Sequence, residues 1–337
     1  MKILFTNAGR RTYMVQFALE LQQAGYPLDV HVSDCSPFSA VMHVSPVVHA
    51  HVLPPALKDP GIYWESFQEL ISREAIDVVF PLMDFDALYL AQHRHELAKI
   101  GCTAVVSAPE TVERCNNKGL MFQFCRNAGL ATPQCWFEPE AFNGSYPVLQ
   151  KQILGYGSSG MRRIESAGDL SGFLPGRDML QELIQGDEFG LDVLNDLDGR
   201  FVAVCVKRKL LMRAGETDKA QIVEDEELSA LGRRISESLR HVGNLDCDIL
   251  RDAEGILYCI DFNPRFGGGY HATHVAGFNY LKALLDMTRG KAPVLPRKPL
   301  PVTVMKGISL HWCETPGHSV EGPKVDEMLL HRSPKGF

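Results

Sequence analysis

Three oxygen-bearing side chains could together hold a divalent cation. Asp248 precedes the turn-forming residues 252–255, and Asp261 and Asn263 follow them, so the flanking segments predict a β-hairpin. Side chains alternate along a strand, so all three project from one face whether Asp248 lies opposite Cys259 or, with the register shifted by two, opposite Asp261. Two such close carboxylates repel each other unless a cation lies between them, and an oxygen-only set suits Mg²⁺ or Mn²⁺ bridging phosphates.

The residues after Asn263 extend this chemistry. Arg265 could neutralise a phosphoryl group during its transfer, and Gly267–Gly269 would let the backbone approach a ligand closely. The alternative is a solvated hairpin edge that happens to be acidic. The combination of carboxylates, arginine and three glycines favours a ligand site.

A glycine-rich loop lies earlier in the chain. Residues 155–160 match G-x-G-x-x-G, but residues 161–164 form a strand-like run where a dinucleotide fingerprint needs a helix. The loop is therefore predicted to be a flap between two antiparallel strands, with N–H groups that can close over a triphosphate, and Lys151 is placed to reach a phosphate oxygen. An ordinary hairpin with a surface lysine remains the alternative.

Other polar residues give weaker signals. The segment from Gln181 to Glu188 could offer main-chain groups to an adenine, with Glu188 accepting hydrogen bonds from a ribose, although isolated acids are normally surface residues. Lys207, Arg208, Lys209 and Arg213 could contact phosphate or substrate, or form a solvated basic run.

A possible substrate site lies near the N-terminus. Arg10 and Arg11 follow the first predicted strand, at the edge where open α/β sheets bind ligands, and could hold a carboxylate. Asp84 and Asp86 follow another strand and could bind an amine. Helix capping or surface charge is the alternative in both cases.

The elements that must position these residues fall into distinct regions. Strands and helices alternate over residues 1–110, which predicts a doubly wound parallel sheet, with strands expected near residues 2–6, 27–32, 77–81 and 103–106. A helix is expected over 111–129. Antiparallel strands follow up to residue 210, then a helix over 226–241, the hairpin, a helix over 274–289 and a strand over 302–310.

Composition excludes several classes of protein. The chain has 337 residues and a net charge of −7, which argues against a dedicated nucleic-acid binder, and no apolar run is long enough for a membrane-spanning helix. The nine cysteines have no C-x-x-C pair, which is typical of reduced, buried thiols in a cytoplasmic protein and disfavours a structural zinc site. Four early histidines, His31, His43, His49 and His51, show no defensible ligand spacing.

Taken together, these motifs resemble the ATP-grasp superfamily, most closely its carbamoyl-phosphate-synthase-like branch, over about residues 1–290. The resemblance is carried by Asn117-Lys118 with residues 129–133, by Tyr146–Lys151 and the flap, by Gln181–Glu188, by Arg213–Thr217, and by Asp248 with residues 261–265. It implies a Rossmann-like pre-ATP-grasp domain (1–110), an N-terminal lobe with the flap (111–188), a C-terminal lobe with the metal site (189–295) and a C-terminal segment (296–337).

The resemblance also implies roles for individual residues. The expected ATP contacts are Lys118, Lys151, Gly155, Gly157, Ser158, Ser159, Gly160, Glu182, Leu183, Ile184 and Glu188, and the expected Mg²⁺ or Mn²⁺ ligands are Asp248, Asp261 and Asn263. Arg265 and Arg213 would be catalytic, and Arg10, Arg11 and Asp84 would bind substrate. The family usually has Glu where Asp261 stands, and the shorter side chain would shift or weaken one ion while keeping the charge.

The implied activity is an ADP-forming ligase. It would pass the γ-phosphoryl group of ATP to a small-molecule carboxylate, and an amine would then displace phosphate from the acyl phosphate. No protein nucleophile is needed for this chemistry. Complete carbamoyl phosphate synthesis is not expected, since it uses two such units. The alternatives are a regulatory or scaffold protein that binds nucleotide but has lost turnover, and a dehydrogenase. Nucleic-acid and membrane partners are not expected, whereas a homodimer is compatible with the sequence.

Overall fold

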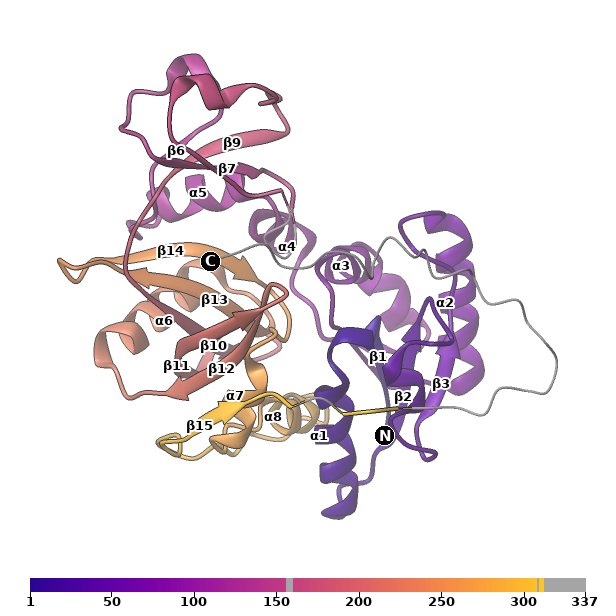
Figure 1. The fold of residues 1–337 in the computed structure, drawn as a ribbon. Coiled ribbons are helices and arrows are strands. Elements are labelled where there is room, and N and C mark those ends of the chain that lie inside the picture. Colours follow the sequence, from indigo (N-terminus) through magenta and orange to yellow (C-terminus); the bar gives the residue numbers. More distant parts are fainter. Residues whose placement is uncertain (156–159, 308, 312–337) are drawn as a thin grey trace.

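A computed structural model describes residues 1–155, 160–307 and 309–311 of the chain (Figure 1). Its first part is a parallel sheet of five strands in the order β3-β2-β1-β4-β5. This confirms the predicted doubly wound domain. The strands are β1 (Lys2–Thr6), β2 (Asp29–Asp34), β3 (His49–Val52), β4 (Val78–Pro81) and β5 (Thr103–Ala104).

Helices cover both faces of this sheet. Apolar side chains alternate along β1, so Phe5 packs on the side of α1 (Thr12–Gln23), whereas Leu4 packs on the side of α2 (Pro60–Glu74) and α3 (Asp84–Lys99). Two short 3₁₀ turns, Ala8–Arg10 and Ala40–His43, follow β1 and β2. β3 was not predicted from the sequence, because three of its four residues are exposed and it lacks the apolar pattern of a buried strand.

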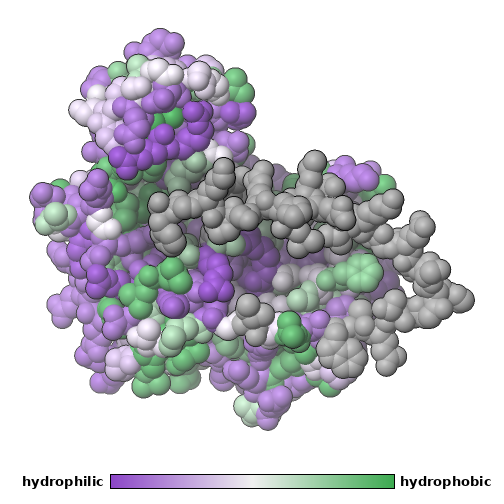
Figure 2. All heavy atoms as spheres, in the orientation of Figure 1, coloured by the Kyte–Doolittle hydropathy of each residue, from purple (hydrophilic) through white to green (hydrophobic). Residues whose placement is uncertain are grey.

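The second part is a small lobe built on a four-stranded antiparallel sheet, in the order β6-β9-β7-β8. The strands are β6 (Cys135–Trp136), β7 (Val148–Gln152), β8 (Arg162–Ile164) and β9 (Asp178–Glu182), with 3₁₀ turns at Pro139–Ala141 and Ala167–Leu170. Its core of buried side chains comprises Val148, Ile164 and Leu180. Figure 2 shows this lobe at the top, with hydrophilic side chains predominating on its surface.

Two helices stand where one was predicted over residues 111–129. They are α4 (Pro109–Asn116) and α5 (Lys118–Asn127). The break occurs at Asn117, which has extended dihedral angles and whose side chain accepts hydrogen bonds from the N–H groups of Gly119 and Leu120. Asn117 therefore begins a new helix, because its side chain caps N–H groups in the first turn of α5 that have no partner within that helix.

The third part is a six-stranded antiparallel sheet in the order β14-β13-β10-β11-β12-β15. The strands are β10 (Asp187–Asn195), β11 (Phe201–Arg213), β12 (Glu216–Ile222), β13 (Gly243–Arg251), β14 (Leu257–Asn263) and β15 (Thr303–Met305). The helices are α6 (Glu226–Leu239), α7 (Tyr270–Val275) and α8 (Tyr280–Met287). The helix predicted over 274–289 was wrong in its start, because Gly277, at φ +91°, separates α7 from α8.

The sheet's two faces pack against different partners. One face lies under α6, with Leu191, Val193 and Ile235 in its core. The other shares a continuous core with the first domain, in which Phe17 of α1 packs edge-on against Tyr270 of α7 at 6.2 Å between ring centroids. Figure 1 shows α1 beside α8. The five-stranded and the six-stranded sheets therefore form one packed body. The small lobe lies beside the β13–β14 hairpin, which carries Asp248 and Asp261 and is called the carboxylate hairpin below.

Two findings concern the whole chain. The described cysteines are free thiols, and all of them except Cys35 are buried, as predicted. Within the described residues, no helix is both long enough and apolar enough to cross a bilayer.

Candidate functional site

The carboxylate hairpin forms the centre of the candidate site. β13 and β14 pair so that Asp248 lies opposite Asp261, and Asp246 lies opposite Asn263. The facing arrangement is one of the two that the sequence allowed, but it arises from a β-bulge at Ile260 instead of a uniform shift of register. Asp246 was missed in the sequence, although its i, i+2 spacing from Asp248 places it on the same face.

Lys209 of β11 lies among these acids. Its Nζ donates to Asp248 at 2.6 Å and to Glu188 at 2.7 Å, and only 4% of its side chain is exposed. Burial alone would lower the pKa of Lys209, but the Asp248 and Glu188 carboxylates outweigh it and raise that pKa. Burial raises the pKa of Asp248 to about 7, and the nearby acids, Asp246 first, add to this against the pull of Lys209.

The predicted alternative of a solvated basic run is wrong for Lys207 and Lys209, whereas the side chains of Arg208 and Arg213 are exposed. Lys207 and Lys209 both point from β11 into the protein, and Lys207 is fully buried in an ion pair with Asp192, with the nearest Asp246 oxygen at 3.5 Å. Burial opposes the charge on Lys207, but Asp192 and Asp246 raise its pKa. The i, i+2 spacing of Lys207 and Lys209 within one strand was the signal in the sequence that both side chains lie on the same buried face.

Two further lysines come from the small-lobe side of the hairpin. Lys118, at the start of α5, is held by a hydrogen bond from its N–H to Ile153 O; its Nζ donates to Gly155 O at 3.1 Å and lies 3.9 Å from Asp261. Lys151 of β7 donates to Gln181 at 2.6 Å. Burial lowers the pKa of Lys151, and the Asp261 carboxylate offsets part of that effect.

A cavity of about 270 Å³ lies between the small lobe and the hairpin. Its lining is mixed, with apolar side chains at Leu149, Leu250 and Ile260, beside charged groups. Among the predicted nucleotide contacts, it brings together Lys118, Lys151, Gly155, Glu182, Ile184 and Glu188. Leu183 and Gly160 are described but do not line it, while Gly157, Ser158 and Ser159 lie outside the described residues.

A second cavity, of about 560 Å³, opens toward the first domain. Its wall includes both predicted arginines of the N-terminal turn, Arg10 and Arg11, as well as Glu216 of β12. The two cavities share five lining residues, which are Lys118, Gly155, Glu188, Asp248 and Asp261. They therefore adjoin at the carboxylate hairpin.

Arg265 and Asp84 form a buried ion pair in the second cavity. The Arg265 Nε lies 2.8 Å from one Asp84 oxygen, and Nη2 donates to the other at 2.9 Å and to Asn263 at 3.0 Å. Burial opposes the charge of Arg265, but Asp84 raises its pKa. The expectation that Asp84 binds an amine needs this correction: its charge is already compensated by Arg265, across 181 positions of sequence.

The remaining predicted arginines divide into two groups. Arg11 is 5% exposed and lies 3.7 Å from Glu216, and Arg10 donates to Ala214 O at 2.8 Å. Arg213, predicted as catalytic, is not among the described residues that line either cavity: its side chain is 61% exposed and pairs with Asp218. Glu216, the cross-strand partner of Arg213, lines the second cavity in its place.

The glycine run after Arg265 serves packing as well as access. A Cβ on Gly267 would lie 2.0 Å from an Asp246 oxygen, one on Gly268 would lie 2.9 Å from Glu216, and one on Gly269 would lie 2.8 Å from Lys207. Gly268 and Gly269 also line the second cavity. The prediction that these glycines admit a ligand is therefore incomplete, because they first make room for the charged side chains beneath the site.

Two protein-family models match the chain. One, described as ATP-grasp in the biosynthetic pathway with Ter operon, matches residues 177–316, and the other, the PylC-like N-terminal domain, matches residues 3–105. No curated protein matches the chain by sequence. The family models confirm the predicted ATP-grasp resemblance, whereas its carbamoyl-phosphate-synthase-like branch stays a prediction.

Solved structures share the fold at low sequence identity. The L-amino acid ligase from Bacillus licheniformis has 18% identity and a TM-score of 0.68, covering 87% of this chain and 74% of its own. N5-carboxyaminoimidazole ribonucleotide synthetase from Thermotoga maritima has 18% identity and a TM-score of 0.64, and the match covers 87% of this chain and 77% of that protein. A third structure is the biotin carboxylase domain of Hydrogenobacter thermophilus 2-oxoglutarate carboxylase, in complex with MgADP, ADP and bicarbonate. It has 16% identity and a TM-score of 0.68, and the match covers 89% of this chain and 71% of that protein.

Proposed function

We propose that this chain, which matches an ATP-grasp model over residues 177–316 and a PylC-like N-terminal model over residues 3–105, is an ADP-forming ligase that joins a small-molecule carboxylate to an amine. The observation that supports this most is the meeting of two cavities at Asp248 and Asp261. The smaller cavity, partly apolar, suits a nucleotide, and the larger, polar cavity suits the acceptor. Transfer of a phosphoryl group between them needs this adjacency.

The residues at the junction fit a divalent cation. Asp248, Asp261 and Asn263 supply oxygen atoms alone, and Asp248 carries a raised pKa because burial and neighbouring acids disfavour its charge. These three residues would hold Mg²⁺ or Mn²⁺. When bound, such an ion would neutralise negative charge on the phosphates.

The chain's own side chains supply the rest of the positioning. Lys118 and Lys151 face the nucleotide cavity and would hold phosphate oxygens. Arg265, kept charged and oriented by Asp84, would stabilise the negative charge of the migrating group from the acceptor side. Arg10 and Arg11, on the wall of the second cavity, would hold the acceptor carboxylate. The carboxylate oxygen would attack the γ-phosphorus, ADP would leave, and the amine would then displace phosphate from the acyl phosphate.

Ligand-dependent melting tests nucleotide binding. ATP or ADP with Mg²⁺ should raise the melting temperature, whereas NAD should leave it unchanged. Stabilisation by NAD alone would overturn the proposal in favour of a dehydrogenase.

ADP release, measured with pools of carboxylic acids and amines that include amino acids, tests turnover. Asp248→Asn and Asp261→Asn should each abolish it, while Glu254→Gln, at the exposed tip of the same hairpin, should leave it unchanged. Nucleotide binding without ADP release from any pool would instead indicate a regulatory or scaffold protein.

A further inference from the structure

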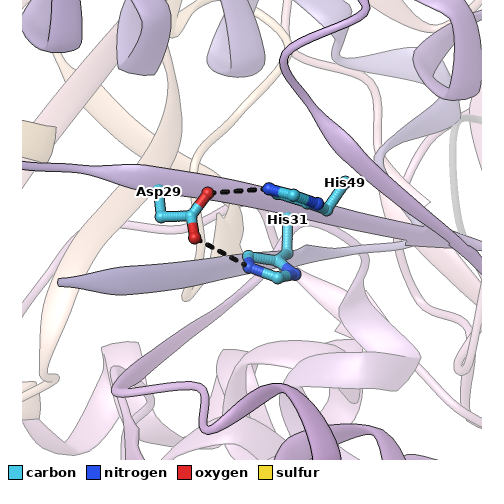
Figure 3. Close-up of side chains that lie close together, drawn as sticks. All are labelled: Asp29, His31 and His49. Carbon is cyan, nitrogen blue, oxygen red and sulfur yellow. Dashed lines mark ion pairs between the residues drawn. The ribbon is translucent and has the colours of Figure 1, made fainter.

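A second cluster of possible metal ligands lies at the opposite end of the parallel sheet from the candidate active site. Asp29 and His31 lie two residues apart on β2, and His49 and His51 two apart on β3, with His31 directly opposite His49. In a pleated sheet, this spacing places all four side chains on one face. Figure 3 shows the carboxylate of Asp29 beside the stacked imidazoles of His31 and His49, with one dashed line to each ring.

The distances are those of a ligand set. The Nε2 of His49 lies 3.0 Å from one Asp29 oxygen, and the Nε2 of His31 lies 3.7 Å from the other (Figure 3). One ligand atom from each of the three residues lies within 4.8 Å of the others. Tetrahedral zinc with bonds of about 2.0–2.1 Å requires its ligand atoms to be about 3.3 Å apart, a value between the two measured distances.

His31, the buried histidine of the cluster, has a ring nitrogen without a hydrogen-bond partner among the described residues. His31 is 1% exposed, and its Nε2 has no hydrogen-bond partner among the described residues. Its other nitrogen, Nδ1, lies 3.0 Å from Nε2 of His51. If His31 Nδ1 donates its proton there, the lone pair of its Nε2 is free toward Asp29, and His51 then fixes the tautomer, as partners of zinc-bound histidines do.

We propose that Asp29, His31 and His49 form a site for Zn²⁺ or a similar transition-metal ion, with His51 orienting His31 from behind. Two imidazoles and one carboxylate favour such an ion over Mg²⁺. The side chains of Asp29 and His49, 39% and 55% exposed, give the ion access and leave space for a water as fourth ligand. The ion would tie β3, at the sheet's edge, to β2. The proposal is independent of the ligase activity.

Zinc titration of the untagged, full-length protein tests the site. The protein is stripped with a chelator and titrated with Zn²⁺ in excess Mg²⁺, so that Mg²⁺ occupies the carboxylate hairpin. Wild type should bind one equivalent, and His49→Ala and Asp29→Asn should each lose it. His51→Ala should weaken binding by roughly 10–100-fold, as expected of a residue that only orients a ligand.

Two matched controls remove competing explanations. His95→Ala changes an exposed histidine outside the cluster, and Cys35→Ser removes the exposed thiol; both should bind zinc like wild type. Circular dichroism of each metal-free variant establishes that it is folded, and the visible spectrum of the Co²⁺ form should show four-coordinate nitrogen and oxygen ligation. Absence of binding by wild type, binding by His49→Ala equal to wild type, or thiolate charge-transfer bands would each overturn the proposal.

Discussion

Replacement of Lys207 by methionine should strongly destabilise the protein. Methionine keeps most of the stem, which packs against Gly190 and Gly269, but removes the ammonium group that pairs with Asp192 and lies 3.5 Å from Asp246. Asp192 is fully buried, so it would be left as an uncompensated charge. Losing one partner of a buried ion pair typically costs about 3–5 kcal/mol, which for a protein of this size corresponds to a melting temperature lower by roughly 4–7 °C.

Calorimetry of the single and double variants measures this effect at pH 7. Lys207→Met with Asp192→Asn should regain a large part of the lost stability, because the amide keeps hydrogen-bonding capacity without a buried charge. As a surface control, Arg200→Met breaks an exposed pair and should change stability by less than about 1 kcal/mol. If Lys207→Met lowered the melting temperature by less than about 2 °C, or if the double variant were no more stable than the single one, the argument that Lys207 compensates a buried charge would be refuted.

Three further predictions concern substrate binding, pH and packing. Arg10→Ala should raise the KM for the carboxylate with ATP binding nearly unchanged; lost ATP binding would contradict its assignment to the acceptor. Burial lowers the pKa of His241 to about 4, below its unfolded value near 6.5, so its stabilising contribution is present above pH 6.5 and is lost as pH falls toward 4. Wild type should therefore lose about 2 kcal/mol more than His241→Phe between pH 7 and 4.5 in urea unfolding, and equal losses would rule this out. Gly267→Ala should destabilise by roughly 1–3 kcal/mol, because its Cβ would overlap Asp246; an unchanged melting temperature would show that the site relaxes freely.

Local signals in the sequence predicted much of the fold. The alternation of strands and helices predicted the parallel sheet, and the turn at 252–255 predicted the hairpin, because both patterns depend on neighbouring residues. The break at Asn117 was also local, since a capping residue there precedes Lys118, but the surrounding helical periodicity concealed it.

The missed features depend on contacts between distant segments. The pairing of Arg265 with Asp84 joins the loop after β14 to the start of α3 in the first domain, and no spacing rule relates those positions. The pairing of Lys209 with Asp248 depends on the position of β11 between β10 and β12, which buries the lysine side chain. The facing of Asp248 and Asp261 required a bulge that has no reliable sequence signal.

The size of the small lobe's core has a consequence for how the protein opens. With Val148, Ile164 and Leu180 as its buried apolar cluster, this lobe holds its strands far less firmly than the extensive core shared by α1, α7 and α8. Backbone amides in β7 and β9 should therefore exchange with deuterium through openings that leave the rest of the molecule folded. If a nucleotide occupies the adjoining cavity as proposed, it would slow that exchange, and the small lobe would gain much of its order from the bound ligand.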